Sequence, residues 1–358
     1  MTFRFSPDPF LVKLLVVLVL ASLLPAHGSG AIAFGWITDL AIALLFFLHG
    51  ARLSREAVIA GMSRWRLHVA IFSATFLLFP ILGVLIGPLV TPWVTRDLYL
   101  GILFLCCLPS TVQSSIAFTS IARGNVSAAV CSASASSLLG VFLTPLLVGV
   151  VMAGQATTHS TVFSLDAIGK IMEQLLLPFV AGQLLRPWIG RWVTRHSQFL
   201  KLVDQGSILL VVYTAFSEAV VGGLWANTPL SALLALLGIL LALLFCVLAL
   251  THMLGRVLKF PLEDRITLLF CGSKKSLSSG IPIANILFAG HAVGAIVLPL
   301  MIFHQIQLVV CAMIAGAYAR RPVTQPKRGH PAHGESTPGG EPLAKRKRGR
   351  LRKGLEQR

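Results

Sequence analysis

The most conspicuous chemical groups in the chain are two adjacent lysines, Lys274 and Lys275, in the segment Gly272-Ser273-Lys274-Lys275-Ser276. They lie well inside the apolar stretch 265–288, where an ionised side chain costs at least a few kcal/mol unless it is paired, hydrated or neutralised. Three functional interpretations are open: an ammonium takes the place of a coupling cation, it titrates and couples solute movement to protons, or it binds an anionic substrate.

The structural alternative is a tether to helix carbonyls or to an acidic partner, for which Asp39, Glu173 and Glu218 are candidates. A further polar residue, His304, lies in the last apolar stretch and either bonds between helices or lines a pathway. Ser132 and Ser134 have two similar interpretations, as part of a small-residue packing seam or of an ion-binding ladder.

A second hydroxyl-rich segment, Cys107-Leu108-Pro109-Ser110-Thr111-Val112-Gln113-Ser114-Ser115, resembles the run from Cys271 to Ser279. Pro, Gly and consecutive Ser in the middle of a membrane helix leave backbone groups without intrahelical partners, and lipid cannot satisfy them. Each segment therefore predicts a broken helix at a protein-enclosed polar cavity, where half-helix ends bind ions or an anionic substrate.

These segments belong to a chain whose composition is that of an integral membrane protein, with 55% apolar and only 12% charged residues. A crossing of the bilayer core needs about 20 mostly apolar residues. On that length the sequence predicts an all-α polytopic protein with ten crossings, at about residues 9–26, 31–49, 67–91, 98–121, 127–153, 167–188, 205–224, 229–254, 265–288 and 292–317.

Basic residues gather in alternate loops and in the C-terminal segment 320–358, which predicts that both termini are cytoplasmic. The segment 320–358 is rich in Pro, Gly, Lys and Arg, and we expect a disordered tail near anionic lipid headgroups. Because the net charge of +17 is concentrated there, it does not indicate a nucleic-acid partner.

The two similar segments lie in the fourth and ninth predicted crossings. Crossings five apart run in opposite directions, so the likeness predicts an inverted repeat of five helices, residues 1–153 against 154–319. The six cysteines fall inside predicted crossings without a CxxC pair, which indicates neither a disulfide framework nor a metal site. No catalytic motif of an enzyme is present, and no cofactor is expected beyond Na⁺ or H⁺ as a coupling ion.

Four runs together resemble the bile acid:sodium symporter superfamily, and most closely its SBF-like branch, over about residues 9–318. They are Leu48-His49-Gly50-Ala51-Arg52-Leu53-Ser54, Leu108 to Ser115, Arg123-Gly124-Asn125 and Gly272-Ser273-Lys274-Lys275-Ser276-Leu277. The resemblance implies a panel domain (crossings 1, 2, 6 and 7), and a core domain (crossings 3–5 and 8–10) in which broken helices 4 and 9 cross beside the substrate site. The candidate binding residues it implies are Ser114, Ser115, Ser273, Lys274 and Lys275, with Ser276 beside them and Thr111, Gln113, Ser132, Ser134 and His304 in supporting roles.

The chain departs from the sodium-coupled members of that superfamily at the ion site. Aligned on Gly272, their sodium-bridging Glu falls on Phe270, and their Gln-Asn pair falls on Lys274-Lys275. Their fifth-helix hydroxyls fall on Ala129 and Ala133. We therefore expect a secondary transporter of the cell membrane that moves an organic anion or similar small solute by alternating access, a lysine replacing the cation. Whether it is coupled to sodium, to protons or to neither is open. The alternative is a non-transporting regulator of ion homeostasis, such as that of calcium, acting through its tail; the oligomeric state is open.

Overall fold

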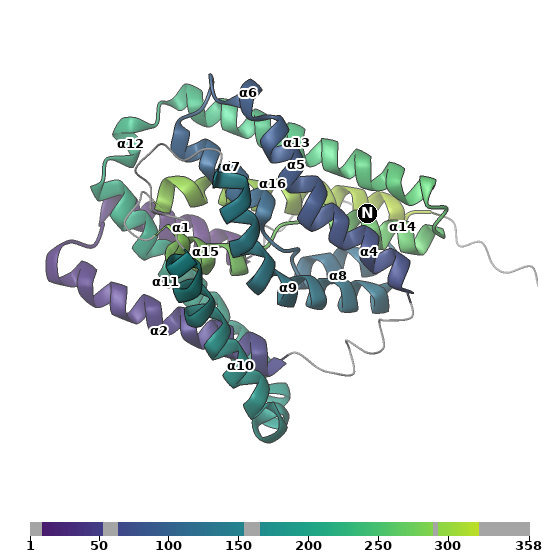
Figure 1. Ribbon diagram of the computed structural model, residues 1–358, viewed down its shortest axis with the longest axis horizontal. Helices are drawn as coiled ribbons and strands as arrows, with labels where there is room; N and C mark the ends of the chain where they lie inside the picture. The colour runs from purple at the N-terminus through teal and green to yellow at the C-terminus, as the bar shows by residue number, and fades with distance from the viewer. Residues whose placement is uncertain (1–8, 53–63, 154–164, 289–292, 322–358) are drawn as a thin grey trace, which may run out of the picture. The chain divides into compact units, whose positions relative to one another are not determined.

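The computed structural model describes residues 9–52, 64–153, 165–288 and 293–321 (Figure 1). Within these ranges the regular structure is helical and no strand occurs. Six stretches are long and apolar enough to cross a membrane, which fits a polytopic membrane protein. They are α2 (Gly28–Arg52), the continuous stretch Trp65–Leu85, α9 (Val126–Ala153), α11 (Ser197–Val221), α13 (Leu230–Val257) and α16 (Val293–Ala319).

The other four predicted crossings have different forms. The first is the shorter helix α1 (Pro9–Leu23), and the sixth lies within α10 (Leu165–Arg195). The fourth and ninth are interrupted where the sequence predicts, giving α7 (Arg96–Cys107) with α8 (Gln113–Ile121), and α14 (Leu262–Gly272) with α15 (Leu277–Leu287). No half of these pairs reaches the roughly 20 residues of a crossing, so ten crossings stay a prediction. The short helices α6 (Gly87–Val90) and α12 (Leu224–Asn227) complete the described elements.

The third stretch is continuous but irregular, because α4 (Trp65–Ser73) passes through a π-helical turn, η2 (Ala74–Leu78), into α5 (Phe79–Leu85). In this turn the Phe79 N–H donates to the carbonyl of Ala74, five residues back. The same register would pair the next residue, Pro80, with the carbonyl of Thr75, but proline has no N–H. The Thr75 carbonyl is therefore available to a donor from another helix.

Helices α1, α2, α10 and α11 pack together, and Figure 1 shows α2 running beside α10. The α2–α10 contact depends on two glycines. A side-chain carbon at Gly50 would collide with the backbone of Phe179, and one at Gly182 would collide with the backbone of Phe47. Such small residues allow two membrane helices to approach closely, which increases their van der Waals contact.

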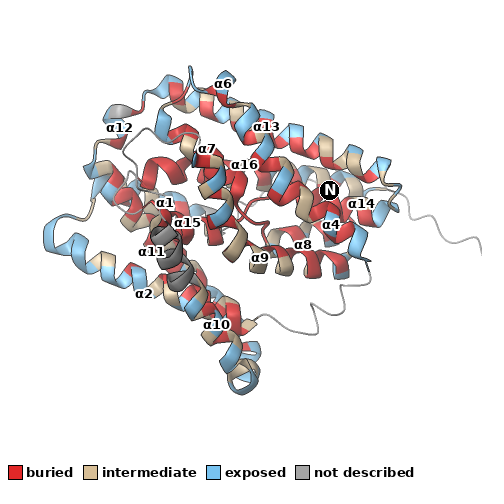
Figure 2. Ribbon diagram, viewed as in Figure 1, coloured by how far each residue is buried: buried red, intermediate tan, exposed pale blue. Residues whose placement is uncertain are grey.

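Helix α16 contacts α7, α8, α13 and α15 and also contacts α11 of the first group. Helices α7 and α14 bury most of their residues, whereas α13 leaves a row of large apolar side chains exposed (Figure 2). An apolar outer surface around a buried centre that contains polar groups is what a lipid solvent requires. The polar groups of the centre gather at the two helix interruptions.

The turn Arg123-Gly124-Asn125 joins α8 to α9 and is fastened to the start of α14. The Asn125 amide donates to Asp264 at 2.8 Å, and Arg64 forms an ion pair with the same carboxylate at 2.9 Å. Arg123 adopts a positive φ of 55° in this turn. The turn holds α8 against α14, and thereby holds one interrupted pair against the other.

Candidate functional site

The first interruption comprises Leu108 to Val112 and releases backbone groups that side chains of α9 then bind. Leu108 is extended, with ψ of 155°, which ends α7 at Cys107. The Thr144 hydroxyl donates to the carbonyl of Cys107 at 3.0 Å, and the Ser110 N–H donates to the Ser136 hydroxyl at 3.1 Å. Because the Ser110 N–H donates to Ser136, it does not make the helical hydrogen bond to the carbonyl of Cys106, four residues before it.

The second interruption, Ser273 to Ser276, lies directly against the first. The Ser276 N–H donates to the carbonyl of Pro109 at 2.9 Å, and the Ser110 hydroxyl donates to the carbonyl of Cys271 at 2.6 Å. Ser115 adds a bond to the carbonyl of Phe270 at 3.2 Å. The two interrupted pairs therefore satisfy each other's backbone groups, as non-helical backbone at membrane depth must.

Lys275 is fully buried and its ammonium has three backbone acceptors. Nζ donates to the carbonyls of Thr75 and Cys106 at 2.8 Å each and to that of Leu108 at 2.7 Å. It also lies 4.1 Å from the centre of the Phe79 ring. An ammonium has three N–H donors, so its hydrogen-bonding capacity is used completely.

Gln307 of α16 fixes the backbone of the same lysine. Its Oε1 accepts from the Lys275 N–H and its Nε2 donates to the Lys275 carbonyl, both at 2.9 Å. Nε2 also lies 2.9 Å from Nδ1 of His304. His304, a predicted site residue, is thus linked to the second interruption through the Gln307 side chain.

Lys274 is equally buried but its surroundings are different. Its Nζ has no hydrogen-bond partner within the described ranges and lies 3.9 Å from the centre of the Phe118 ring. The Cys271 and Cys311 thiols are its polar neighbours. Of the predicted acidic partners, Asp39 and Glu218 are exposed and pair with neither lysine, and both ion pairs between described side chains use arginine. The side chain of Glu173 lies outside the described part.

A cavity of about 570 Å³ lies between the group of α1, α2, α10 and α11 and the interrupted helices. The first turns of both α8 and α15 line it, through Gln113 and Ser114 and through Leu277 to Ser279. Helix N-termini present N–H groups without intrahelical partners and the positive end of the helix dipole. Two such termini at one cavity favour a negatively charged ligand.

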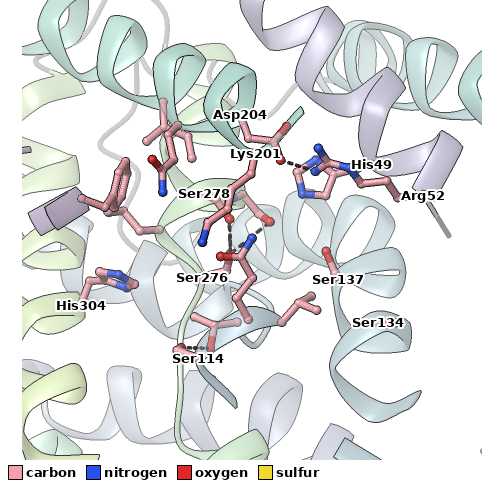
Figure 3. Close-up of a pocket in the computed structure, with 18 of the residues that line it drawn as sticks. His49, Arg52, Ser114, Ser134, Ser137, Lys201, Asp204, Ser276, Ser278 and His304 are labelled. Carbon is pink, nitrogen blue, oxygen red and sulfur yellow. Dashed lines mark hydrogen bonds and ion pairs between the residues drawn. The ribbon is translucent and has the colours of Figure 1, made fainter. Parts of the chain in front are cut away.

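Charged side chains enter the cavity from the opposite group of helices. Arg52 at the end of α2 forms an ion pair with Asp204 of α11, and Lys201 lies one turn before that aspartate. Figure 3 shows His49, Arg52, Lys201 and Asp204 approaching the space above Ser276 and Ser278. Apolar side chains from both groups complete the wall, namely Phe10, Ala117, Phe118, Leu138, Phe179, Ile208 and Leu308.

The predicted site residues therefore divide into two sets. One set lines the cavity: Thr111, Gln113, Ser114, Ser134, Ser276 and His304. The other is buried in the contact behind it: Ser115, Ser132, Ser273, Lys274 and Lys275. Ser132 bonds to Nδ1 of His68 at 2.6 Å and Ser273 bonds to the carbonyl of Leu269 at 2.5 Å, which are bonds within the protein. The roles of both sets in binding stay predictions.

The sequence did not identify Arg52, Asp204 and Lys201 as cavity residues. Arg52 and Lys201 are interpreted from the sequence only as basic residues of the loops between crossings. A signal was available in Asp204, an acidic residue on an apolar helix with a mostly buried side chain. Such a residue is expected to have a partner or a function.

The chain is similar to known proteins over most of its length. The model of the SBF-like CPA transporter family matches residues 8–320. An uncharacterized protein of Pseudomonas aeruginosa is 60% identical over 318 residues, 89% of this chain and 95% of that protein. YfeH of Escherichia coli, named as a candidate symporter, is 57% identical over 314 residues, 88% of this chain and 93% of its own. Sodium/bile acid cotransporter 7 of Rattus norvegicus is 28% identical over 326 residues, 87% of this chain and 92% of its own.

Proposed function

The chain belongs to the SBF-like CPA transporter family, and from this premise we propose that it carries a small organic anion across the cell membrane. The observation that supports the charge of the solute is the pair of helix N-termini, of α8 and α15, at one cavity. The Ser276 hydroxyl caps the Ser279 N–H at the start of α15, and the first-turn N–H groups that have no such cap can bind a carboxylate or sulfonate. Arg52 and Lys201 add positive charge on the facing wall.

The walls and size of the cavity support an organic body on that anion. The volume of about 570 Å³ is in the range of small-molecule sites, and Phe10, Phe179 and Leu308 give it apolar surface. An inorganic ion would leave this surface facing water. A molecule with one anionic end and an apolar body would use both the helix termini and the apolar wall.

The mechanism we propose is alternating access between two groups of helices. Helices α1, α2, α10 and α11 would form the panel, and the helices around the two interruptions would form the core, with residues 1–153 and 154–319 as inverted repeats. The cavity between the groups would be the substrate site. With both termini cytoplasmic, as the basic loops predict, Arg52 and Lys201 would mark its cytoplasmic end.

Transport on this proposal does not use sodium. The name of the Rattus norvegicus relative includes sodium and bile acid, but the present chain has Lys274 and Lys275 at the predicted ion position. A second positive charge beside a resident ammonium would be repelled at low dielectric. The driving force would then be the anion gradient itself or a proton gradient.

The test is reconstitution of the purified protein in proteoliposomes. Thermal-shift measurements with aryl carboxylates, aryl sulfonates and a bile acid, each beside an uncharged amide analogue, identify the bound class. Uptake of the best anion is then measured with sodium and with choline outside. We expect anions to stabilise the protein more than their amides, and uptake to be equal in the two salts. Stabilisation by amides alone, or uptake only with sodium, would contradict the proposal.

A further inference from the structure

Three backbone carbonyls at the centre of the protein have lost their helical donors and point at one position. Thr75 lost its donor because Pro80 has no N–H in the π-helical register. Cys106 lost its donor because the Ser110 N–H is bound to Ser136. Leu108 lies in the interruption itself, beyond the end of α7. Unsatisfied carbonyls in a buried place are costly, so this position needs a donor or a cation.

The ammonium of Lys275 occupies that position. Its distances of 2.7–2.8 Å to the three oxygens are those of charge-assisted hydrogen bonds, and the Phe79 ring closes another side. Lys275 arrives from a different helix pair than any of its three acceptors. The backbone has therefore formed a cation-binding cage, and the cation is supplied by the chain.

We propose that the carbonyls of Thr75, Cys106 and Leu108 form a cation site that Lys275 fills permanently, so that the protein contains its own non-exchangeable core cation. The same cage would accept a free primary ammonium if the side chain were removed. The consequence for coupling rests on the proposed transport function: a tethered cation cannot be released, so no cation gradient is used at this position. The existence of the cage does not depend on transport.

Lys274 provides a matched internal control. It is the neighbouring residue, is equally buried, and also lies over an aromatic ring, that of Phe118. Its Nζ nevertheless has no hydrogen-bond acceptor within the described ranges. Removing this ammonium leaves no cage behind, so an external amine has no oxygens to bind there.

The experiment is chemical rescue of Lys275→Ala, purified and measured in lipid nanodiscs with n-propylammonium chloride. This ion supplies the methylenes and the ammonium that alanine lacks. The controls are n-propanol, which has a similar volume without charge, sodium and choline chloride, and the variant Lys274→Ala. We expect n-propylammonium to raise the Tm of Lys275→Ala saturably and to recover most of the loss. Wild type and Lys274→Ala should not respond.

Three results would contradict the proposed cation site. They are equal rescue by n-propanol, equal rescue of Lys274→Ala, or saturable stabilisation of wild type by sodium over choline. If Lys275→Ala does not fold, Lys275→Met fills the volume without charge and keeps the test decisive: wild-type Tm in this variant would refute the cage, and a large loss of Tm would support it. Because all readouts are stabilities, a failure of anion transport would not affect them.

Discussion

The interruption between α7 and α8 contributes oxygen acceptors to the centre of the protein, whereas the interruption between α14 and α15 contributes ammonium groups. The Leu108 carbonyl lies in the first interruption and the Cys106 carbonyl lies in α7 just before it, and both accept from Lys275 of the second. Both are hydroxyl-rich and both begin a half-helix at the cavity. Two segments of similar sequence therefore supply different partners for Lys275: the first provides carbonyl oxygens, and the second provides the lysine itself.

This difference explains how the buried centre holds Lys275 without an acidic partner among the described side chains. Backbone carbonyls at a helix interruption are fixed dipoles that need donors, and Lys275 supplies them. Lys274 shows that proximity to the interruption is not enough, because its Nζ has an aromatic ring and thiols as neighbours instead. The two residues have the same type and burial but should differ in energetic importance.

The largest expected effect is the contrast between Lys275→Met and Lys274→Met. Lys275→Met leaves three buried carbonyls without a donor, and we expect a loss of about 3–5 kcal/mol, as for removal of one partner of a buried charged pair. Lys274→Met removes a buried amino group that has no hydrogen-bond acceptor within the described ranges, and we expect no loss of stability. Thermal unfolding in nanodiscs measures both. Equal losses would show that the two ammonium groups are equivalent.

A smaller loss of stability is expected when the Ser110 hydrogen bond between the two interruptions is removed. Ser110→Ala removes the 2.6 Å bond to the carbonyl of Cys271 and leaves that buried oxygen unsatisfied, with a cost of about 1–3 kcal/mol. The matched control is Ser114→Ala, whose hydroxyl lines the cavity and bonds within its own segment to Thr111 at 2.8 Å. We expect Ser114→Ala to cost less in Tm. The reverse order would contradict the distinction between contact and cavity residues.

An effect of similar or smaller size is expected at Gly140, which positions the first interruption from α9. A side-chain carbon there would lie 2.5 Å from the Pro109 ring, so Gly140→Ala should cost about 1–3 kcal/mol through overpacking. Gly238 of α13 has open space at the same position, and Gly238→Ala should be neutral or slightly stabilising. Unfolding midpoints of the two variants in the same lipid check this pair.

The smallest effect on stability, with a clear effect on function, is expected at Lys201. Its side chain is exposed and lines the cavity, so Lys201→Gln should change stability by only about 0.5 kcal/mol or less. On the proposed function it should raise the KM for anion uptake. Arg191→Gln, at an exposed position of α10 outside the cavity lining, is the matched charge control. Equal KM values in both variants would remove Lys201 from the substrate site.

Much of the site could be located from the sequence, because its local signals are strong. Pro109, Gly272 and the flanking serines predict helix interruptions, and the helices are interrupted within both segments, after Cys107 and after Gly272. The hydrophobic stretches predict helices for the same reason, since a lipid solvent requires long apolar runs. The inverted repeat and the orientation stay predictions.

The sequence by itself determined that two lysines lie beside a helix interruption at membrane depth, because residue type and hydropathy are local properties. Only the tertiary structure decided which lysine has acceptors. That choice depends on a π-helical turn before Pro80, on the hydroxyl of Ser136 and on the path of α7, which come from three other segments of the chain. Direction and distance between such segments are set by packing, so two neighbouring residues of identical type acquire different roles.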